Sequence, residues 1–222
     1  MVTALSFQQV DDGFLIFTDG ATGTTDGKTG PVVLSKPVMI PHASAVITVR
    51  GGAELGDLLS EAEDEAQSFD RLIDRFPAAM GAALERAAPW LDQHGWAGMG
   101  GEVYLLGWSA SRSAWEAWLW EFEGQLRTGM TVELRRLPAM WTAPMDETVA
   151  GQLAAKGIGP SLKDADSIDT IMAGHLEVMR ALRDHPWPAA DGSPARHQIG
   201  GFCQCTILTK GGVTSFIMED WR

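Results

Sequence analysis

The feature of this sequence that most constrains its fold is the presence of strand-like runs with no polar face. Residues 14–17 are all apolar, and in residues 115–122 apolar side chains, several of them tryptophan, occur at both odd and even positions. Because side chains alternate between the two faces of a strand, such runs need cover on both faces. An antiparallel sheet with one face in water would instead alternate. Two sheets packed together, each backed by helices, meet this requirement.

The order of the predicted elements favours an α/β fold of the α+β type with mainly antiparallel sheets. Strands are expected at residues 3–9, 14–18, 37–40, 45–49, 102–109, 115–121, 132–137, 198–209 and 213–218. Helices are expected at residues 55–62, 68–89, 146–156 and 167–183, with Pro77 at a kink and Pro89 at the end of its helix or in a short extra turn. Short turns between neighbouring strands favour antiparallel pairing. We therefore predict a four-layer αββα sandwich, formed by residues 1–222 as a single domain.

Charge and hydropathy exclude several classes of function. The formal net charge is −12, which opposes binding to nucleic-acid phosphates and to anionic membrane surfaces. The sequence contains no run of eighteen apolar residues, and its first residues lack the basic and apolar segments of a secretory signal. We expect a cytoplasmic protein, or a component of the virion if the gene belongs to a phage. No nucleic-acid or membrane partner is expected.

The residues most often found in metal or cofactor sites show no matching pattern. Cys203 and Cys205 stand two residues apart, where a disulfide would be strained and a metal would lack further ligands, so we interpret them as buried apolar side chains. His175 lies among apolar residues at helical spacing and is interpreted as a core histidine. The sequence has no zinc-binding histidine pair, no Gly-x-Ser-x-Gly elbow and no phosphate loop. We therefore expect no cofactor and no metal.

Four sequence features occur in order along the first half of the chain. Thr3 opens the first predicted strand and Asp19 ends the second. Lys36 then precedes a short apolar strand, and Gly51-Gly52 precede the first predicted helix. This ordered set resembles the proteasome β-subunit group of N-terminal nucleophile (Ntn) hydrolases, although Lys36 is one position later than in the family pattern.

The resemblance implies a catalytic role for each of these residues. Thr3 would be the nucleophile, and a hydroxyl needs a nearby base to react at neutral pH. In the family this base is the free α-amino group of the same threonine. Lys36, held by Asp19, would supply positive charge that lowers the relevant pKa values. The N–H of Gly51 would face the developing oxyanion.

The sequence departs from the family pattern at the point that matters most for activity. Met1 and Val2 precede Thr3, so the nitrogen of Thr3 is part of a peptide bond, and Val2 stands where family propeptides present glycine. The later Gly-Ser-Gly segment of the family is not found between Phe122 and Trp141. We therefore interpret Thr3 and its three companions as a vestigial site.

Three hypotheses of function follow. The first is a catalytically inert structural or assembly subunit, in a cell or a phage particle, with homo-oligomer formation or other protein subunits as its interactions. The alternative is a threonine-type Ntn amidohydrolase or peptidase that uses Thr3 after processing. The third is a small-molecule binder that uses the vestigial cleft. Tryptophans predicted in loops would either form a partner surface or close the ends of the sandwich.

Overall fold

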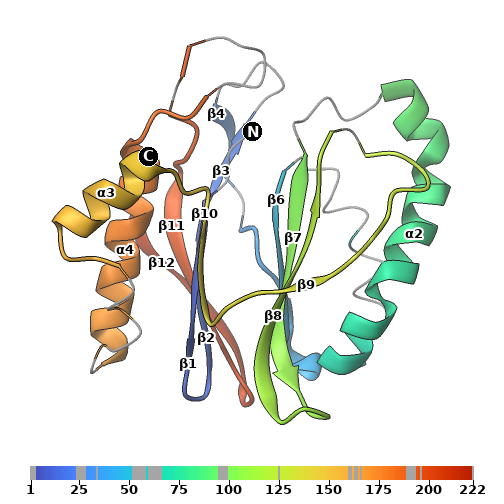
Figure 1. The fold of residues 1–222 in the computed structure, drawn as a ribbon, viewed down its shortest axis with the longest axis horizontal. Helices are drawn as coiled ribbons and strands as arrows, with labels where there is room; N and C mark the ends of the chain where they lie inside the picture. The colour runs from blue at the N-terminus through green and yellow to red at the C-terminus, as the bar shows by residue number, and fades with distance from the viewer. Residues whose placement is uncertain are drawn as a thin grey trace. The chain divides into compact units, whose positions relative to one another are not determined.

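A computed structural model describes most of the chain and divides it into two compact units. The described residues are 4–23, 29–33, 35–51, 59, 67–94, 100–124, 126–159, 162, 165, 167–188, 194–195 and 197–221. The first unit comprises Met1–Lys36, Ala139–Ile207 and Thr214–Arg222. The second comprises Pro37–Pro138 and Leu208–Val213. Each unit is built around its own five-stranded sheet (Figure 1).

The sheet of the first unit joins strands from both ends of the chain. Its strands, in spatial order, are β10 (Met140–Ala143), β1 (Leu5–Val10), β2 (Gly13–Asp19), β11 (Phe202–Thr209) and β12 (Gly212–Asp220). β1 pairs antiparallel with both β2 and β10. A separate two-stranded sheet pairs β3 (Ala21–Gly23) with β4 (Thr29–Val33). The predicted adjacency of the first two strands is confirmed.

Two helices cover the sheet of the first unit, α3 (Glu147–Ala155) and α4 (Ile168–Asp184) (Figure 1). Each begins after a side chain that caps it: the Asp146 carboxylate accepts from the Val149 N–H at 2.8 Å, and the Ser167 hydroxyl accepts from the Thr170 N–H at 3.2 Å. The apolar sides of both helices pack with the inner side chains of β2 and β11, namely Leu15, Phe17, Cys203 and Cys205. All seven residues of β2 are buried, so this strand is covered on both faces as its sequence predicts.

The second unit repeats this plan with one long helix. Its sheet has the order β5 (Val38–Ile40), β6 (Ala45–Arg50), β7 (Gly101–Ser109), β8 (Ala114–Phe122) and β9 (Arg135–Arg136), and every pairing is antiparallel. A 3-10 turn, η1 (Pro41–Ala43), connects β5 to β6. Helix α2 (Phe69–His94) runs along one face of the sheet, and its apolar side chains form a core with alternate residues of β6, β7 and β8. The Ser68 hydroxyl accepts from the Arg71 N–H at 3.2 Å, which confirms Ser68 as the predicted start of this helix.

The structure confirms the α+β class and the two antiparallel sheets, and it corrects several element boundaries. Helix α2 does not end at Pro89 but continues to His94, with Pro77 and Pro89 inside it. A proline removes one backbone hydrogen bond, and the apolar face that packs on the sheet evidently outweighs that loss. The strand expected at residues 132–137 is reduced to β9, whereas β3, β4 and β10 were not predicted. The helix expected at residues 55–62 lies outside the described residues except for Leu59, and the single domain stays a prediction.

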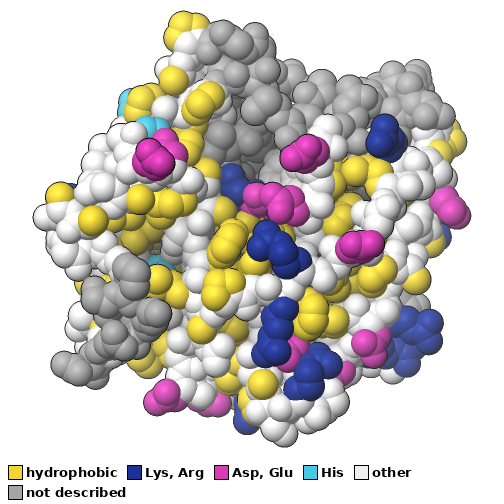
Figure 2. Space-filling view, in the orientation of Figure 1, with side chains coloured by type: hydrophobic (Ala, Val, Ile, Leu, Met, Phe, Trp, Pro, Cys, Tyr) yellow, Lys and Arg dark blue, Asp and Glu magenta, His cyan; other side chains and the backbone are white. Residues whose placement is uncertain are grey.

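The surface carries both signs of charge. On the face shown in Figure 2, acidic side chains are scattered, while Lys and Arg side chains gather in the lower central part. None of the described helices is long and apolar enough to cross a membrane.

Candidate functional site

Asp19, the last residue of β2, is the centre of a buried ion pair in the first unit. Its side chain has no solvent exposure, and Lys36 Nζ donates to Oδ1 at 2.6 Å. The N–H of Ala4 also donates to Oδ1, at 3.0 Å. The N–H groups of Ala21 and Gly200 donate to Oδ2, each at 3.3 Å. Besides the neighbouring Ala21, one carboxylate thus binds three segments that are far apart in the sequence.

The backbone after Asp19 is held by close contact with the entry to β11. The N–H of Gly20 lies 3.1 Å from the carbonyl oxygen of Gly200 and 3.0 Å from that of Phe202. A Cβ atom on Gly20 would lie 2.6 Å from the Phe202 ring, which is far inside van der Waals contact. Only glycine fits here without displacing the ring, so the backbone directly after Asp19 lies against the entry to β11.

Lys36 reaches Asp19 from the segment that precedes β5. The side chain of Lys36 is 10% exposed, so most of its length is out of water. The neighbouring Ser35 accepts a hydrogen bond from Gln204 Nε2 at 2.8 Å, and the same amide nitrogen donates to Ser215. The C-terminal hairpin therefore anchors the segment that carries the lysine.

The four residues predicted for the site are placed as follows. Asp19 and Lys36 are brought together. Thr3 lies outside the described residues, but it directly precedes Ala4, whose N–H is bound by Asp19. Gly51 belongs to the second unit and follows β6 at a φ of +145°, a conformation that favours glycine. Catalysis by these residues stays a prediction.

A second polar cluster of the first unit lies between β1 and α4. The Ser6 hydroxyl and His175 Nδ1 are 2.8 Å apart, and His175 Nε2 is 3.1 Å from Gln8 Oε1. The imidazole stacks on Phe17 with ring centroids 4.7 Å apart, and burial lowers the pKa of His175 to about 4. Ser6 also shares a hydrogen bond of 2.7 Å with Thr142.

This cluster contains a hydroxyl, from Ser6, and an imidazole, from His175, the groups of a nucleophile and its base, but it is closed to solvent. Ser6 is 0% exposed and His175 is 1% exposed, so a substrate does not reach either group. Both ring nitrogens have partners, and neither partner is a carboxylate that would orient the ring and stabilise its charged form. The prediction of a core histidine is confirmed, and the cluster joins β1 to α4 and β10.

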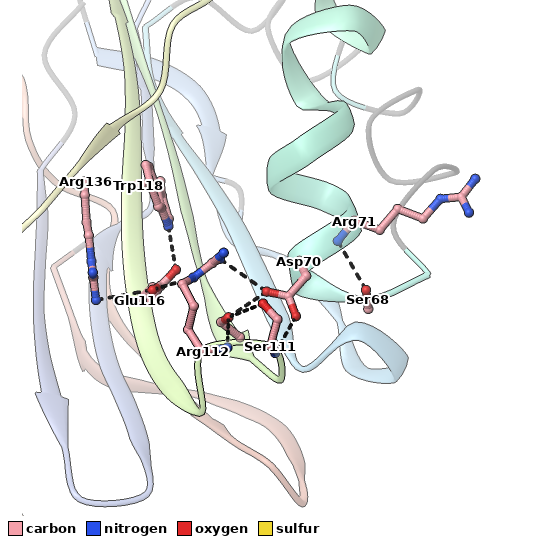
Figure 3. Close-up of polar contacts among 9 residues, drawn as sticks. Ser68, Asp70, Arg71, Ser111, Arg112, Glu116, Trp118 and Arg136 are labelled. Carbon is pink, nitrogen blue, oxygen red and sulfur yellow. Dashed lines mark hydrogen bonds and ion pairs between the residues drawn. The ribbon is translucent and has the colours of Figure 1, made fainter.

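The second unit contains a buried carboxylate with two arginines (Figure 3). Glu116, on β8, has a fully buried side chain and accepts from Arg112 Nε at 2.8 Å and from Trp118 Nε1 at 3.0 Å. Arg136 Nη2 lies 3.2 Å from the same Oε1 atom as Arg112. The charge of Glu116 is thus compensated by Arg112 in the turn that precedes β8 and by Arg136 in β9.

The same cluster ties the start of α2 to the turn between β7 and β8 (Figure 3). The Asp70 carboxylate accepts from the Ser109 hydroxyl at 2.6 Å and the Ser111 N–H at 2.9 Å, and it pairs with Arg112 at 3.2 Å. Burial raises the pKa of Asp70, but the hydrogen bonds from Ser109 and Ser111 outweigh burial and leave this pKa below its usual range. We assign these contacts to the stability of the unit.

The cysteines are unreactive. Burial raises the pKa of both Cys203 and Cys205 to about 12, so the nucleophilic thiolate is scarce at neutral pH. Among the residues that the structure describes, no group of three or more His, Cys, Asp or Glu side chains is placed to hold a metal ion.

Comparison with known proteins identifies the fold. No family model and no curated protein sequence matches the chain. Among solved structures, a Gly-1 mutant of Anbu from Hyphomicrobium sp. strain MC1 matches with a TM-score of 0.61 and 10% identity, over 98% of this chain and 88% of that one. Anbu from Yersinia bercovieri, described as an ancestral beta-subunit, matches with a TM-score of 0.62 and 9% identity, over 97% of this chain and 87% of that one.

The chain has a proteasome-like fold. The coverage includes the second half of the chain, where the sequence resemblance was limited to element order. Sequence identity of about one residue in ten shows the fold alone, so the residues of the site have to be argued from their own contacts.

Proposed function

We propose that this proteasome-like protein carries a threonine-type amide hydrolase site that is blocked while Val2 is joined to Thr3. The contact between Lys36 and Asp19, at 2.6 Å, is the observation that carries the proposal. The same carboxylate oxygen binds the N–H of Ala4, the residue that follows Thr3. A buried ion pair is often no more stabilising than an apolar pair of similar volume, so its contact with the residue that follows Thr3 supports a chemical role.

The proposed reaction uses Thr3 as nucleophile and its own amine as base. The hydroxyl oxygen attacks the amide carbonyl carbon of the substrate while its proton passes to the α-amino group. The C–N bond then breaks, the amine product leaves with that proton, and an ester remains on Thr3. Water hydrolyses the ester to a carboxylic acid. Lys36 supplies positive charge that favours the neutral amine, and Asp19 positions Lys36.

Val2 blocks this reaction at its first step. An amide nitrogen is essentially non-basic, whereas a free α-amino group titrates near ~7.7. Loss of the general base alone reduces the rate by about 10²–10⁴-fold. The chain that begins at Met1 is therefore expected to be inert, in agreement with the first functional hypothesis from the sequence.

The proposal is tested by exposing Thr3. Two chains are compared, one beginning at Met1 and one released from a cleavable fusion so that it begins at Thr3. We expect a mass-spectrometric peptide-pool assay to detect cleavage only for the second chain, and cleavage should be lost in Thr3→Ala and reduced in Lys36→Met. Intact mass should reveal an acyl adduct on Thr3. A folded chain that begins at Thr3 and cleaves nothing would overturn the proposal.

The second candidate is an inert assembly subunit. It is favoured wherever Val2 stays joined to Thr3, because the nucleophile then has no free amine. The description of the Yersinia bercovieri neighbour as an ancestral beta-subunit is consistent with such a role. Inactivity of the Thr3-first chain, together with stable self-association, would favour this candidate.

A further inference from the structure

Strand β12 forms one edge of the sheet in the first unit. In the spatial order β10-β1-β2-β11-β12 it has a neighbour on one side only, and within the described residues no strand pairs with its outer edge. An edge strand presents a row of backbone N–H and C=O groups with no partner strand, which is a template for pairing with another strand. β12 spans nine residues, Gly212–Asp220, and contains no proline.

The edges of the other five-stranded sheet are protected against such pairing. β5 has three residues and is flanked by Pro37 and Pro41. β9 has two residues, Arg135 and Arg136, both charged and exposed. Short length, proline and charge are the usual means by which natural sheets avoid association at their edges. β12 has none of these along residues 212–218.

The side chains of β12 add apolar surface to this edge. Phe216 is 39% exposed and Ile217 is 54% exposed. As neighbours on a strand they point to opposite faces, so both faces carry exposed apolar surface at this position. The strand is anchored from its inner side: the Ser215 hydroxyl is 2.8 Å from Thr206 Oγ1, and Glu219 accepts from Arg180 Nε at 2.7 Å. An edge that is already ordered loses little entropy when it pairs.

We propose that β12 is a self-association edge, at which two copies of the chain pair their β12 strands antiparallel about a two-fold axis. The charges of the strand favour a second copy as the occupant. Lys210 precedes the strand and Asp220 ends it, with no charged residue in 212–218. Antiparallel pairing places opposite charges together, whereas parallel pairing would place like charges together.

One register satisfies these requirements. With the two-fold axis at Ser215, Lys210 of each copy lies opposite Asp220 of the other. Ile217 then lies opposite Val213 and Phe216 opposite Thr214, so apolar surface is covered on both faces. The contact is isologous and closes after two copies, which gives one continuous sheet with five strands from each copy. This inference does not depend on the chemistry of Thr3.

The first test is the oligomeric state of the full chain. Sedimentation velocity from about 1 to 100 μM should show a monomer–dimer equilibrium. Ile217→Lys should weaken the dimer by at least about 100-fold, since it places two like charges within the paired strands. Ile168→Lys is the matched control, because Ile168 is 51% exposed at the start of α4 and is not part of the proposed strand pairing, so it should leave the dimer unchanged.

The second test reverses the charge of Lys210 in one variant and of Asp220 in another, and then mixes the two variants. Lys210→Asp alone and Asp220→Lys alone each place like charges opposite one another at both ends, so each variant should dimerise at least several-fold more weakly. An equimolar mixture of the two should form heterodimers with an affinity close to that of the unaltered chain, because both ends then carry opposite charges. The recovery also shows that both variants are folded.

Three outcomes would overturn the proposal. They are a chain that stays monomeric up to 100 μM, an oligomer that Ile217→Lys leaves intact, and a mixture of the two charge variants that associates no better than either alone. The residues tested leave Thr3, Asp19 and Lys36 unchanged, so failure here says nothing against the amide hydrolase, and an inactive Thr3 says nothing against the dimer.

Discussion

The two partners of the Asp19–Lys36 ion pair are held very differently. Asp19 accepts hydrogen bonds from three backbone N–H groups in addition to Lys36. Lys36 is held at this place in the fold through its contact with Asp19. The carboxylate would remain well solvated by the protein if the lysine were lost. The ammonium would lose its compensating charge if the carboxylate were neutralised.

This difference predicts unequal effects of two substitutions. Asp19→Asn should lower the free energy of unfolding by about 3 kcal/mol, because it removes the carboxylate charge that lies 2.6 Å from a largely buried ammonium. Lys36→Met should lower it by only about 1 kcal/mol, since the N–H donors remain. Urea unfolding of the two variants measures both values. The double variant should be more stable than Asp19→Asn alone, and the opposite order would contradict this account of the pair.

The buried His175 predicts a loss of stability in mild acid. Its pKa is about 4 in the folded chain, against an ordinary value of 6.5 for a solvated imidazole, so between these values the unfolded chain binds a proton that the folded chain excludes. The stability present above pH 6.5 should therefore fall as the pH is lowered, by up to about 3 kcal/mol at pH 4.

Chemical denaturation at pH 7 and at about pH 4.5 checks this prediction. His175→Gln has no group that titrates in this window, so its stability should change less between the two pH values than that of the unaltered chain. Equal pH dependence in both proteins would show that carboxylates, and not His175, control the acid response.

At the scale of elements, the sequence predicted features that depend on neighbouring residues, such as the starts of helices, but not the extent of strand pairing. Asp146 and Ser167 cap α3 and α4, as their residue types indicate. The run 132–137 alternates like a strand, yet its ladder pairing with β8 is limited to Arg135 and Arg136, followed by one backbone hydrogen bond from Leu137 to Ala117. A strand requires a neighbour to pair with, and no pattern within residues 132–137 indicates how many of them do so.

The polar clusters show the same limit. Ser6 and Gln8 share one face of β1, but their partner His175 is 169 and 167 residues away. Asp19 and Lys36 were predicted through the family resemblance, because no local rule joins an aspartate to a lysine seventeen residues later. Three of the four polar contacts on this carboxylate come from segments that meet only when the chain is folded.

One close approach between elements makes a sharp prediction about packing. A Cβ atom on Gly107, in β7, would lie 2.2 Å from the ring of Phe69, the first residue of α2. Gly107→Ala should therefore lower the free energy of unfolding by about 1–3 kcal/mol through overpacking.

Gly81→Ala is the matched control in α2 itself. A Cβ atom there meets nothing within 4 Å, so alanine should raise the stability by about 0.5–1 kcal/mol through its better helix propensity. Thermal or urea unfolding distinguishes the two signs. A neutral effect of Gly107→Ala would show that Phe69 has room to move.

At the scale of the whole molecule, the net charge of −12 acts on every encounter between two copies. Long-range repulsion opposes association, and it is screened over ~10 Å at 0.1 M salt. The exposed Lys210–Asp220 contacts contribute little by comparison.

The dimer proposed for β12 should therefore tighten as salt is added. Between about 20 and 300 mM NaCl we expect the dissociation constant to fall by about tenfold, measured by sedimentation. Ile217→Lys should stay monomeric at both concentrations. A dimer that loosens with salt would mean that the ion pairs at the ends of β12 outweigh the repulsion between the two bodies.

The contact between Asp19 and Gly200 has a consequence for the order of events during synthesis. β2 leaves the ribosome early, but the amide of Gly200 is translated 181 residues after Asp19, and the neighbouring strand β11 follows it. Until then the Asp19 carboxylate lacks the hydrogen bond from Gly200, and β2 lacks its neighbour β11 in the sheet. Pairing between such distant segments is slow compared with local folding. The nascent N-terminal segment therefore cannot complete the hydrogen-bond shell of Asp19 before Gly200 has been translated.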